Sequence, residues 1–216
     1  MTHLKRHAVP KTWPIARKGT TFVIKPSFGF SKGMPLLVIL RDMLKIVKNR
    51  KEAKKAIYMK NILVNGKDAK DEKDGVVLFD VVTIVPSEKS YRLTMSNTGK
   101  FDLEETDKNN ANKKIAKIVG KTILKGKKIQ LNLSDGKNFL SDIKCKTNDS
   151  ALIDFKSKKI EKCIPLKNNS EVFIFAGKHS GKKGKIENID EEKKIASIND
   201  GKEKINVLIK QFIVTE

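Results

Sequence analysis

The sequence is poor in cysteine, in long apolar runs and in acidic residues near its start. Its two cysteines, Cys145 and Cys163, have no second cysteine or histidine at metal-ligand spacing, so neither a metal centre nor a disulfide framework is predicted. We expect both to be reduced core residues. The apolar run at residues 36–40 (LLVIL) is far shorter than the roughly 20 residues of a membrane-spanning helix. The charged start, MTHLKRHAVPK, lacks the apolar segment of a signal peptide, and none is expected.

What the sequence does contain is positive charge. It has 46 basic against 25 acidic residues and a net charge of +21, and 41 of the basic residues are lysines while five are arginines. Lysine is a hydrated point charge that neutralises phosphate, whereas the planar arginine side chain reads guanine edges. The composition favours a nucleic acid or an anionic membrane as partner, recognised through its charge. A lysine-rich proteome would explain the ratio of lysine to arginine, but not the excess over acids.

The charge is concentrated near the start of the chain. Residues 1–35 carry seven basic side chains and no acid, and residues 36–67 carry nine basic and two acidic ones. About two thirds of the excess therefore lies in the first 67 residues. We expect residues 1–35 to be an extended basic arm that is disordered alone. Trp13 in this arm is predicted either to stack on a base or to fill a hydrophobic pocket.

Residues 36–60 have the pattern of two helices. Apolar residues recur with helical spacing from 36 to 47, after a proline that suits a helix start, and Arg41, Lys45 and Lys48 would share another face. Asn49 and Glu52 fit a capping box at the start of a second helix. That helix is predicted to bury Ala53, Ala56 and Ile57 and to present Arg50, Lys51, Lys54, Lys55 and Lys60 to solvent. Two packed helices would then share one basic surface.

Strands are predicted from residue 62 onwards. Asn65-Gly66 is a tight-turn signal after an apolar triplet, and residues 75–85 read as one buried strand. Further strands are expected at 90–95, 114–119, 127–134, 151–155 and 159–166. The tripeptide GKT at 120–122 lacks the earlier glycine of a phosphate loop, since Ile115 stands there, and its surroundings indicate a strand.

The stretch EVFIFAGKHSGKKGKI at 171–186 combines an alternating strand with three glycines and interspersed lysines. Gly177, Gly181 and Gly184 would let backbone N–H groups approach a phosphate, or would only form hairpin turns. His179 is expected to be a polar contact of this loop. Four more strands, within 185–216, would complete a five-stranded barrel.

Several of these segments together resemble known RNA-binding modules. LRDML, KEAKKAI, ILVNGK and LFDVVTI occur in an order that resembles the S-four RNA-binding fold, and residues 171–186 are similar to the KOW motif. With HLKR, Trp13, PLLVILRDML, YRL and IQLNLSDGKN, nearly the whole chain resembles the archaeal and eukaryotic type of small-subunit ribosomal protein four. The short length fits an archaeal form better.

The predicted fold class is α+β. It consists of a basic arm at 1–35, a helical S-four-like module at 36–88, a β-rich central domain at 89–167 and a C-terminal SH3-like KOW barrel at 168–216. The resemblance implies a structural, non-catalytic constituent of the small ribosomal subunit, located in the cytoplasm. Its implied partners are small-subunit ribosomal RNA and neighbouring ribosomal proteins. No cofactor, metal, membrane, small-molecule substrate or homo-oligomer is expected.

The residues expected to contact RNA are mostly basic and lie in the arm, in the helical module and at the glycine-rich loop. They are Lys5, Arg6, Trp13, Arg17, Lys18, Arg41, Lys45, Lys48, Arg50, Lys51, Lys54, Lys55, Lys60, Lys67, Lys137, Lys178, His179, Lys182, Lys183 and Lys185. The residues expected to set loop geometry are Gly66, Gly177, Gly181 and Gly184.

Two other functions stay open at this point. An RNA-modifying enzyme could use the S-four module to hold its substrate, although three histidines, two isolated cysteines and scattered acids offer no catalytic arrangement. A free translational or transcriptional regulator could be built from the same modules. Sedimentation of a cell lysate separates these from a ribosomal component, which should travel with small subunits.

Overall fold

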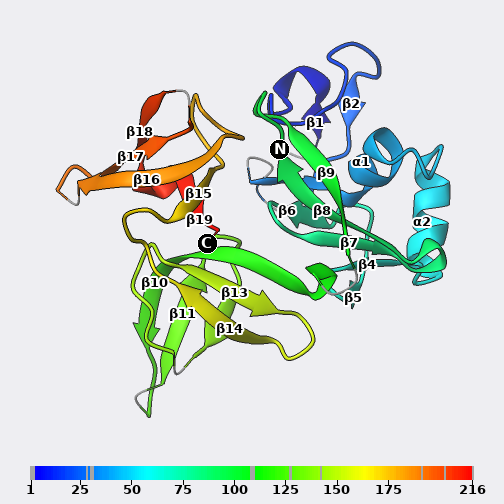
Figure 1. Cartoon of the computed structure of the whole chain (residues 1–216). Coiled ribbons are helices and arrows are strands. Elements are labelled where there is room, and N and C mark those ends of the chain that lie inside the picture. Colours follow the sequence, from blue (N-terminus) through cyan, green and yellow to red (C-terminus); the bar gives the residue numbers. More distant parts are fainter. Residues whose placement is uncertain are drawn as a thin grey trace. The chain divides into compact units, whose positions relative to one another are not determined.

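A computed structural model describes residues 3–27, 29, 32–107, 110–126, 128–141, 143–190, 192–201 and 203–215 of the chain (Figure 1). The chain divides into two compact units, and each is described by itself. The first unit comprises Met1–Met95 and Lys100–Asn112, and the second comprises Ser96–Gly99 and Lys113–Glu216. In the described residues, strands predominate and helices are few, so the β-rich character is the larger part of the predicted α+β fold.

The first unit holds the described helices α1 and α2 and a five-stranded antiparallel sheet in the order β5-β4-β7-β8-β9. Strands β1 and β2 pair with each other, as do β3 and β6. The strands are β1 (Leu4–Lys5), β2 (Phe22–Val23), β3 (Gly33–Pro35), β4 (Ile62–Val64), β5 (Lys67–Asp68), β6 (Gly75–Val77), β7 (Val81–Ile84), β8 (Lys89–Met95) and β9 (Phe101–Thr106). The helical segments are η1 (Arg6–Ala8), α1 (Leu36–Val38), η2 (Ile39–Met43), α2 (Arg50–Tyr58), η3 (Val85–Ser87) and η4 (Asn110–Asn112).

The first predicted helix is shorter than expected. After α1 the backbone widens into the π-helical turn η2, in which the Leu44 N–H donates to the Ile39 carbonyl at 2.9 Å. Lys45 then adopts a left-handed conformation with φ of 55°, which ends the helix. The prediction of one helical face through Arg41, Lys45 and Lys48 is therefore wrong. No glycine or proline marks this break, so helical periodicity alone extended the helix too far.

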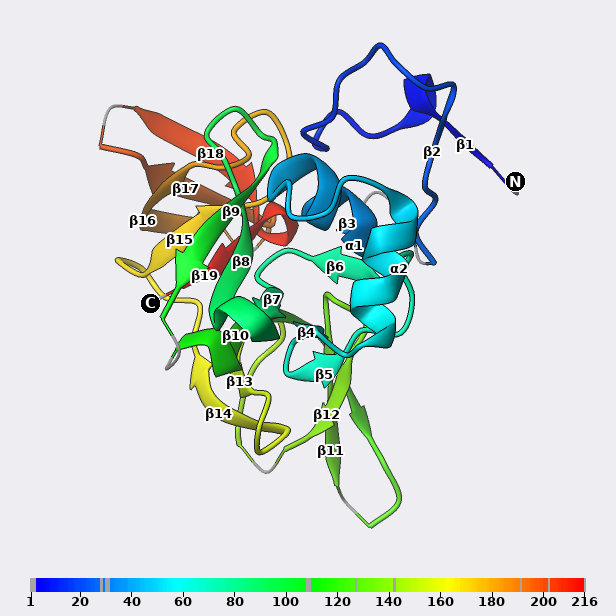
Figure 2. The same cartoon turned by 90° about the vertical axis from the view of Figure 1, so that its right-hand side faces the viewer.

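The second predicted helix is confirmed as α2, next to α1 (Figure 2). The Asn49 side chain accepts a hydrogen bond from the Glu52 N–H at 3.0 Å, as the capping box predicts. The Glu52 carboxylate reaches one residue further back than in the ideal motif, to the Lys48 N–H at 2.7 Å. Ala53 and Ile57 are buried, whereas Ala56, also predicted to be buried, is only half-buried. The lysines of α2 lie on the opposite, exposed face.

The Asn65-Gly66 turn between β4 and β5 is also confirmed. Both residues have positive φ, 53° and 71°, which is the type I′ hairpin geometry. Asn65 is in addition buried, and its amide donates to the Asp80 carboxylate at 2.7 Å while its oxygen accepts from the Val81 N–H at 3.0 Å. The turn is thus tied to the neighbouring strand by side-chain hydrogen bonds.

The single strand predicted at 75–85 is wrong, because the chain turns between β6 and β7. Asp80 is buried and accepts a hydrogen bond from the Val77 N–H at 2.7 Å, and Phe79 has φ of 64°. The carboxylate closes a local turn that competes with an extended backbone. As a result β6 pairs with β3, whereas β7 pairs with β4 and β8.

The basic arm contributes buried side chains to the first unit. Leu4, Val9 and Trp13 are buried, and the Trp13 indole N–H donates to the Gly33 carbonyl at 3.0 Å. Trp13 is only 2% exposed, so the pocket-filling alternative holds and this residue does not offer a face for stacking on a base. Amphipathic tryptophan is well suited to such a buried, hydrogen-bonded position.

The second unit contains two antiparallel five-stranded sheets, in the orders β12-β11-β10-β13-β14 and β18-β17-β16-β15-β19. Its elements are β10 (Lys113–Ile123), β11 (Ile129–Leu133), β12 (Asn138–Leu140), β13 (Ser150–Asp154), β14 (Lys159–Ile164), β15 (Glu171–Ile174), β16 (Lys183–Asp190), β17 (Ile195–Asn199), β18 (Lys204–Leu208), η5 (Ile209–Gln211) and β19 (Phe212–Val214). Each sheet has its own cluster of buried apolar side chains. Cys145 is buried and Cys163 partly buried, and both are free thiols.

The predicted strands of this unit are all present, and GKT lies within β10 as expected. Strand β12 of this unit was not predicted, and neither were β1, β2, β3 and β9 of the first unit. Lys127 and Glu216, at the ends of two predicted strands, lie outside the described residues. Strand β8 continues the sheet of the first unit past residue 88, and the four-part division at 35, 88 and 167 stays a prediction.

Lys117 on β10 is expected to make the second unit more stable at alkaline pH. Its ammonium donates to the Ile209 and Phe212 carbonyls, and burial lowers its pKa to about 8. Between pH 8 and the unfolded value of roughly 10.4 the unfolded chain binds a proton that the folded chain does not, so stability rises with pH. The free energy of unfolding should rise by roughly 2 kcal/mol between pH 7.5 and 9.5, relative to Lys117→Met.

Urea unfolding of both proteins at the two pH values measures this difference. Lys121→Met is the matched control, because Lys121 lies on the same strand but is exposed. The change in unfolding free energy of Lys121→Met between the two pH values should equal that of the parent protein. If the difference in unfolding free energy between the parent and Lys117→Met were the same at both pH values, the lowered pKa of Lys117 would be contradicted.

Candidate nucleic-acid interface

A cavity of about 1020 Å³ lies in the first unit, between the arm and the segment that carries α1 and α2. Among the described residues that line it there is no aspartate or glutamate. Five cationic side chains line it instead, namely Arg6, Lys25, Arg41, Arg50 and Lys73. A concave surface with one sign of charge concentrates counterions of the opposite sign. The cavity is therefore suited to a polyanion.

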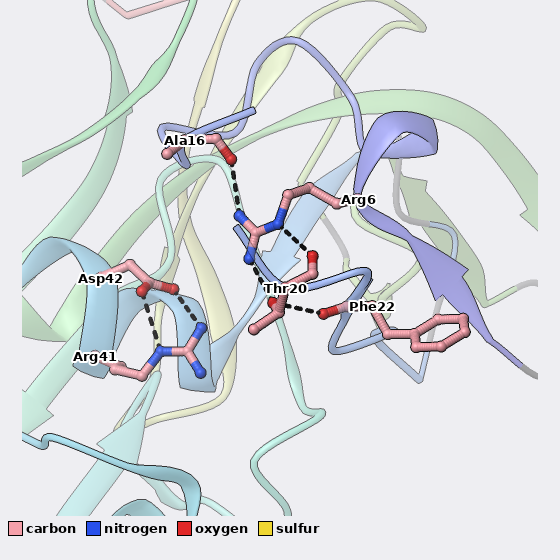
Figure 3. A network of polar contacts seen from close by, with 6 residues as sticks. All are labelled: Arg6, Ala16, Thr20, Phe22, Arg41 and Asp42. Carbon is pink, nitrogen blue, oxygen red and sulfur yellow. Dashed lines mark hydrogen bonds and ion pairs between the residues drawn. The ribbon is translucent and has the colours of Figure 1, made fainter. Parts of the chain in front are cut away.

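Arg6 organises one wall of this cavity (Figure 3). Its guanidinium donates to the carbonyls of Ala16 and Thr20 and to the Thr20 hydroxyl, each at 2.7 Å. These partners are uncharged, so they do not cancel the positive charge. A guanidinium has five N–H donors, and three are used here. Arg6 thus holds the loop at 16–20 and still has donors that can bind a phosphate.

Two other arginines of the cavity are paired with carboxylates. Arg41 makes two hydrogen bonds to the neighbouring Asp42, at 3.0 and 2.8 Å (Figure 3). The hydrogen bond to Asp42 raises the pKa of Arg41. Arg50 donates to the buried carboxylate of Glu72 at 2.8 Å, and Lys54 lies 3.7 Å from the same oxygen. Much of their charge is thus compensated within the protein, which the sequence did not indicate.

Glu72 stays ionised and keeps this ion pair over a wide pH range. Burial on its own would raise the pKa of Glu72, but hydrogen bonding with Asp71 and Arg50 outweighs burial and lowers it to about 2. The pair therefore fixes the orientation of α2 relative to the loop that carries Lys73. The Lys73 carbonyl in turn accepts hydrogen bonds from the Ser27 N–H and hydroxyl, at 3.0 and 3.2 Å.

The remaining predicted basic residues of the first unit are exposed but lie outside the cavity lining. Lys60 forms an ion pair with Asp68 at 3.5 Å. The others are Lys5, Arg17, Lys18, Lys45, Lys48, Lys51, Lys54, Lys55 and Lys67. Sequence reasoning missed Lys25, Lys73 and Phe22 as parts of one site. The lack of acids in residues 1–35 could have pointed to Lys25, whereas Lys73 lies in an acidic stretch and gave no signal.

The glycine-rich loop of the second unit connects β15 to β16. Gly177 and Gly181 have φ of 92° and 93°. The Gly181 N–H donates to the Ile174 carbonyl at 2.7 Å, and the Lys182 N–H to the His179 carbonyl at 3.3 Å. These two backbone groups close the turn, so they are not available to a phosphate, and the hairpin alternative describes them better.

The side chains around this loop differ in their surroundings. Lys182 pairs with Asp200 at 3.0 Å and Lys185 lies 3.7 Å from Glu171. Lys178 and Lys183 are exposed, and His179 is half-buried. Lys137, on a separate turn of this unit, lies over the Phe155 ring at 5.7 Å.

The described residues also bear on other kinds of site. Their histidine, cysteine, aspartate and glutamate side chains form no group of three or more that could hold a metal ion. None of the helices in this part of the chain has the length and apolar character needed to cross a bilayer.

Comparisons with known proteins identify the family. The model of ribosomal family S4e matches residues 87–160, and that of the RS4NT (NUC023) domain matches residues 2–29. The small ribosomal subunit protein eS4 of Methanocella arvoryzae is 42% identical over 190 residues, covering 87% of this chain and 80% of that protein. The eS4 protein of Nanoarchaeum equitans is 39% identical over 196 residues, covering 87% of this chain and 84% of that protein. The chain belongs to ribosomal family S4e.

The fold of this S4e protein is similar to a solved structure of the family. The crystal structure of the 30S ribosomal protein S4e from Thermoplasma acidophilum superposes with a TM-score of 0.72 at 27% identity, over 85% of this chain and 94% of that chain. The resemblance drawn from sequence motifs is thus confirmed. The segment that the S4e model matches spans β8 to β13 and part of β14, and the match to RS4NT covers most of the arm.

Proposed function

We propose that this S4e protein is a structural constituent of the small ribosomal subunit that binds ribosomal RNA mainly through phosphate contacts. The observation that carries the proposal is the cavity at which Arg6, Lys25 and Lys73 lie together with the carboxylate-paired Arg41 and Arg50. Its described lining residues include no aspartate or glutamate. Membership in a ribosomal family supports a structural role within the cytoplasmic ribosome, next to neighbouring small-subunit proteins. We assign it no catalytic activity and no homo-oligomer.

The finer architecture is part of the same proposal. Residues 36–88 would act as an S-four-like module, supported by the capped helix α2 and the type I′ turn at Asn65-Gly66. Residues 168–216 would act as a KOW barrel of the SH3-like type, supported by the five strands β15 to β19 and the lysine-bearing loop. In both modules lysines would displace the counterions condensed on RNA and allow phosphates to lie close to the protein.

Sedimentation of a cell lysate in moderate salt tests the ribosomal role. The protein is expected to migrate with small subunits and polysomes. A free regulator or an RNA-modifying enzyme would stay near the top of the gradient, and that outcome would reject the proposal.

Binding of the isolated protein to small-subunit ribosomal RNA is expected to be strongly salt-dependent. If about six to ten phosphates are engaged, raising salt from 50 to 200 mM should weaken binding roughly a thousandfold or more. Lys73→Gln should weaken binding uniformly across RNA sequences and reduce the slope of log affinity against log salt by about 1. Filter binding or fluorescence anisotropy at four or more salt concentrations gives both quantities.

Lys70→Gln is the matched control for Lys73→Gln. Lys70 is also exposed and lies three residues earlier, but it does not line the cavity. It should leave the slope nearly unchanged. Equal losses of RNA affinity in Lys73→Gln and Lys70→Gln would contradict a binding site at the cavity. Binding that does not depend on salt would reject the phosphate mechanism.

A further inference from the structure

Phe22 combines two properties that the phosphate contacts do not explain. Its side chain is 54% exposed although it is a large aromatic ring, and it lines the cation-rich cavity. The His3 ring lies 5.6 Å from it, tilted by 56°. Single exposed apolar side chains are common on protein surfaces, so the informative feature is the position of this ring at a cation-lined cavity. An aromatic face beside clustered cations is the arrangement with which proteins hold unpaired nucleotides.

The backbone of Phe22 is held in place by the Arg6 contacts. The Thr20 hydroxyl accepts from Arg6 at 2.7 Å and donates to the Phe22 carbonyl at 3.0 Å, and the ring of Phe22 points away from these groups (Figure 3). Lys5 on β1 pairs with Phe22 on β2 in a ladder of only two strands. A two-stranded ladder is weak alone, so the Arg6–Thr20–Phe22 chain of hydrogen bonds supplies the rigidity.

We infer that Phe22, with His3 beside it, is a stacking platform for an unpaired base of ribosomal RNA whose phosphates lie in the cation-lined cavity. This inference rests on the proposed function and specifies its ligand as a single-stranded or looped nucleotide. Bases within a duplex have no free face, whereas an unpaired base does. Arg6 acts as a positioning residue, because a preordered loop loses less conformational entropy when the base binds.

The surroundings of the ring favour RNA over a protein segment. Leu4 and Leu37 of the cavity lining are buried and Val23 and Ile24 are half-buried, so among the described lining residues Phe22 is the large apolar side chain that is exposed. Cationic side chains line the same cavity, without a carboxylate among the described lining residues. A docking helix or strand of a protein needs a continuous apolar patch, while a base needs one flat ring and its phosphate needs a cation.

The test uses the full chain and a single-stranded oligoribonucleotide of about 12 residues that carries one 2-aminopurine, with the corresponding duplex as a second probe. Stacking should quench the 2-aminopurine fluorescence. Phe22→Ala is expected to weaken single-strand binding roughly 5- to 100-fold, to abolish the quenching and to leave the salt slope and the duplex affinity unchanged. Phe22→Trp should restore the single-strand affinity and the fluorescence quenching. Phe22→Leu, which keeps apolar bulk without a ring, should restore neither.

Tyr58→Ala is the matched control, since Tyr58 is 89% exposed but lies on α2 outside the cavity lining. It should bind as the parent does. If Phe22→Ala binds single strands normally while Lys73→Gln weakens binding, the stacking platform is rejected and the phosphate interface stands. If neither change matters, the interface itself is rejected. A Phe22→Ala protein that binds both probes normally but fails to join small subunits would overturn the inference in favour of a protein contact.

Discussion

Gly181→Ala is expected to destabilise the second unit strongly. Gly181 has φ of 93°, and a Cβ there would lie 2.0 Å from the Ser96 carbonyl oxygen and 2.6 Å from its carbon. These are backbone atoms, which cannot rotate away as a flexible side chain can. The positive φ costs about 1–2 kcal/mol and the overlap about 1–3 kcal/mol more. A total loss of roughly 2–5 kcal/mol is a large part of the 5–15 kcal/mol that stabilises a typical domain.

The matched control is Gly136→Ala. Gly136 has a similar φ of 86°, but no atom lies within 4 Å of the position that its Cβ would take. It should show only the conformational cost of about 1–2 kcal/mol. Denaturant unfolding, followed by circular dichroism, measures both variants. Similar losses of unfolding free energy in Gly181→Ala and Gly136→Ala would show that the close approach to the Ser96 backbone adds no cost, which would contradict this prediction.

Asp135→Asn is expected to destabilise the second unit by about 3–5 kcal/mol. The Lys114 ammonium lies 2.8 Å from the Asp135 carboxylate, and the two side chains are only 1% and 3% exposed. Burial alone would raise the pKa of Asp135, but the charge and hydrogen bond of Lys114 outweigh burial and lower it. Removing the carboxylate charge leaves the buried ammonium without this compensation, which is why the cost is large.

The pH dependence of this ion pair follows from the direction of the shift. The folded pKa of Asp135 lies below its unfolded value of roughly 3.9. The contribution of the ion pair to the free energy of unfolding is therefore complete at neutral pH and is lost as pH falls through the folded pKa. The difference in unfolding free energy between the parent and Asp135→Asn should therefore be largest near pH 7 and shrink in acid. Urea unfolding is suitable, since urea does not screen charges.

Lys113 and Glu161 provide the control for burial. They also lie 2.8 Å apart, and Lys113 is adjacent to Lys114 in sequence, but their side chains are 39% and 45% exposed. Glu161→Gln should cost no more than about 1 kcal/mol. If Asp135→Asn proved as mild as Glu161→Gln, burial would not be the reason for the strength of the inner pair.

Much of the local structure could be predicted because short-range chemistry specifies it. Asn49 and Glu52 are three residues apart, and the cap that they form depends on little else. The Asn65-Gly66 hairpin follows from two residues that tolerate positive φ. Strand β15 and the strands after it could be predicted from side chains that alternate between the two faces of a strand.

Features that depend on distant partners could not be predicted. The first helical segment ends after Met43 although no glycine or proline marks its end. The chain turns at Asp80 because that carboxylate accepts hydrogen bonds from the Val77 N–H and the Asn65 amide. The sequence allows Trp13 either to stack on a base or to be buried, and the Gly33 carbonyl that accepts from its indole N–H decides for burial.

Composition and motif order were enough to place this chain in a ribosomal family and to show that its charge is cationic, because both are properties of the residues themselves. Which cations lie together was decided only in three dimensions. Lys73 joins Arg6 and Lys25 at one cavity because Ser27 binds the Lys73 carbonyl, while Arg41 and Arg50 are compensated by carboxylates. Electrostatic energy depends on the distance between charges in space, and linear order does not contain that distance.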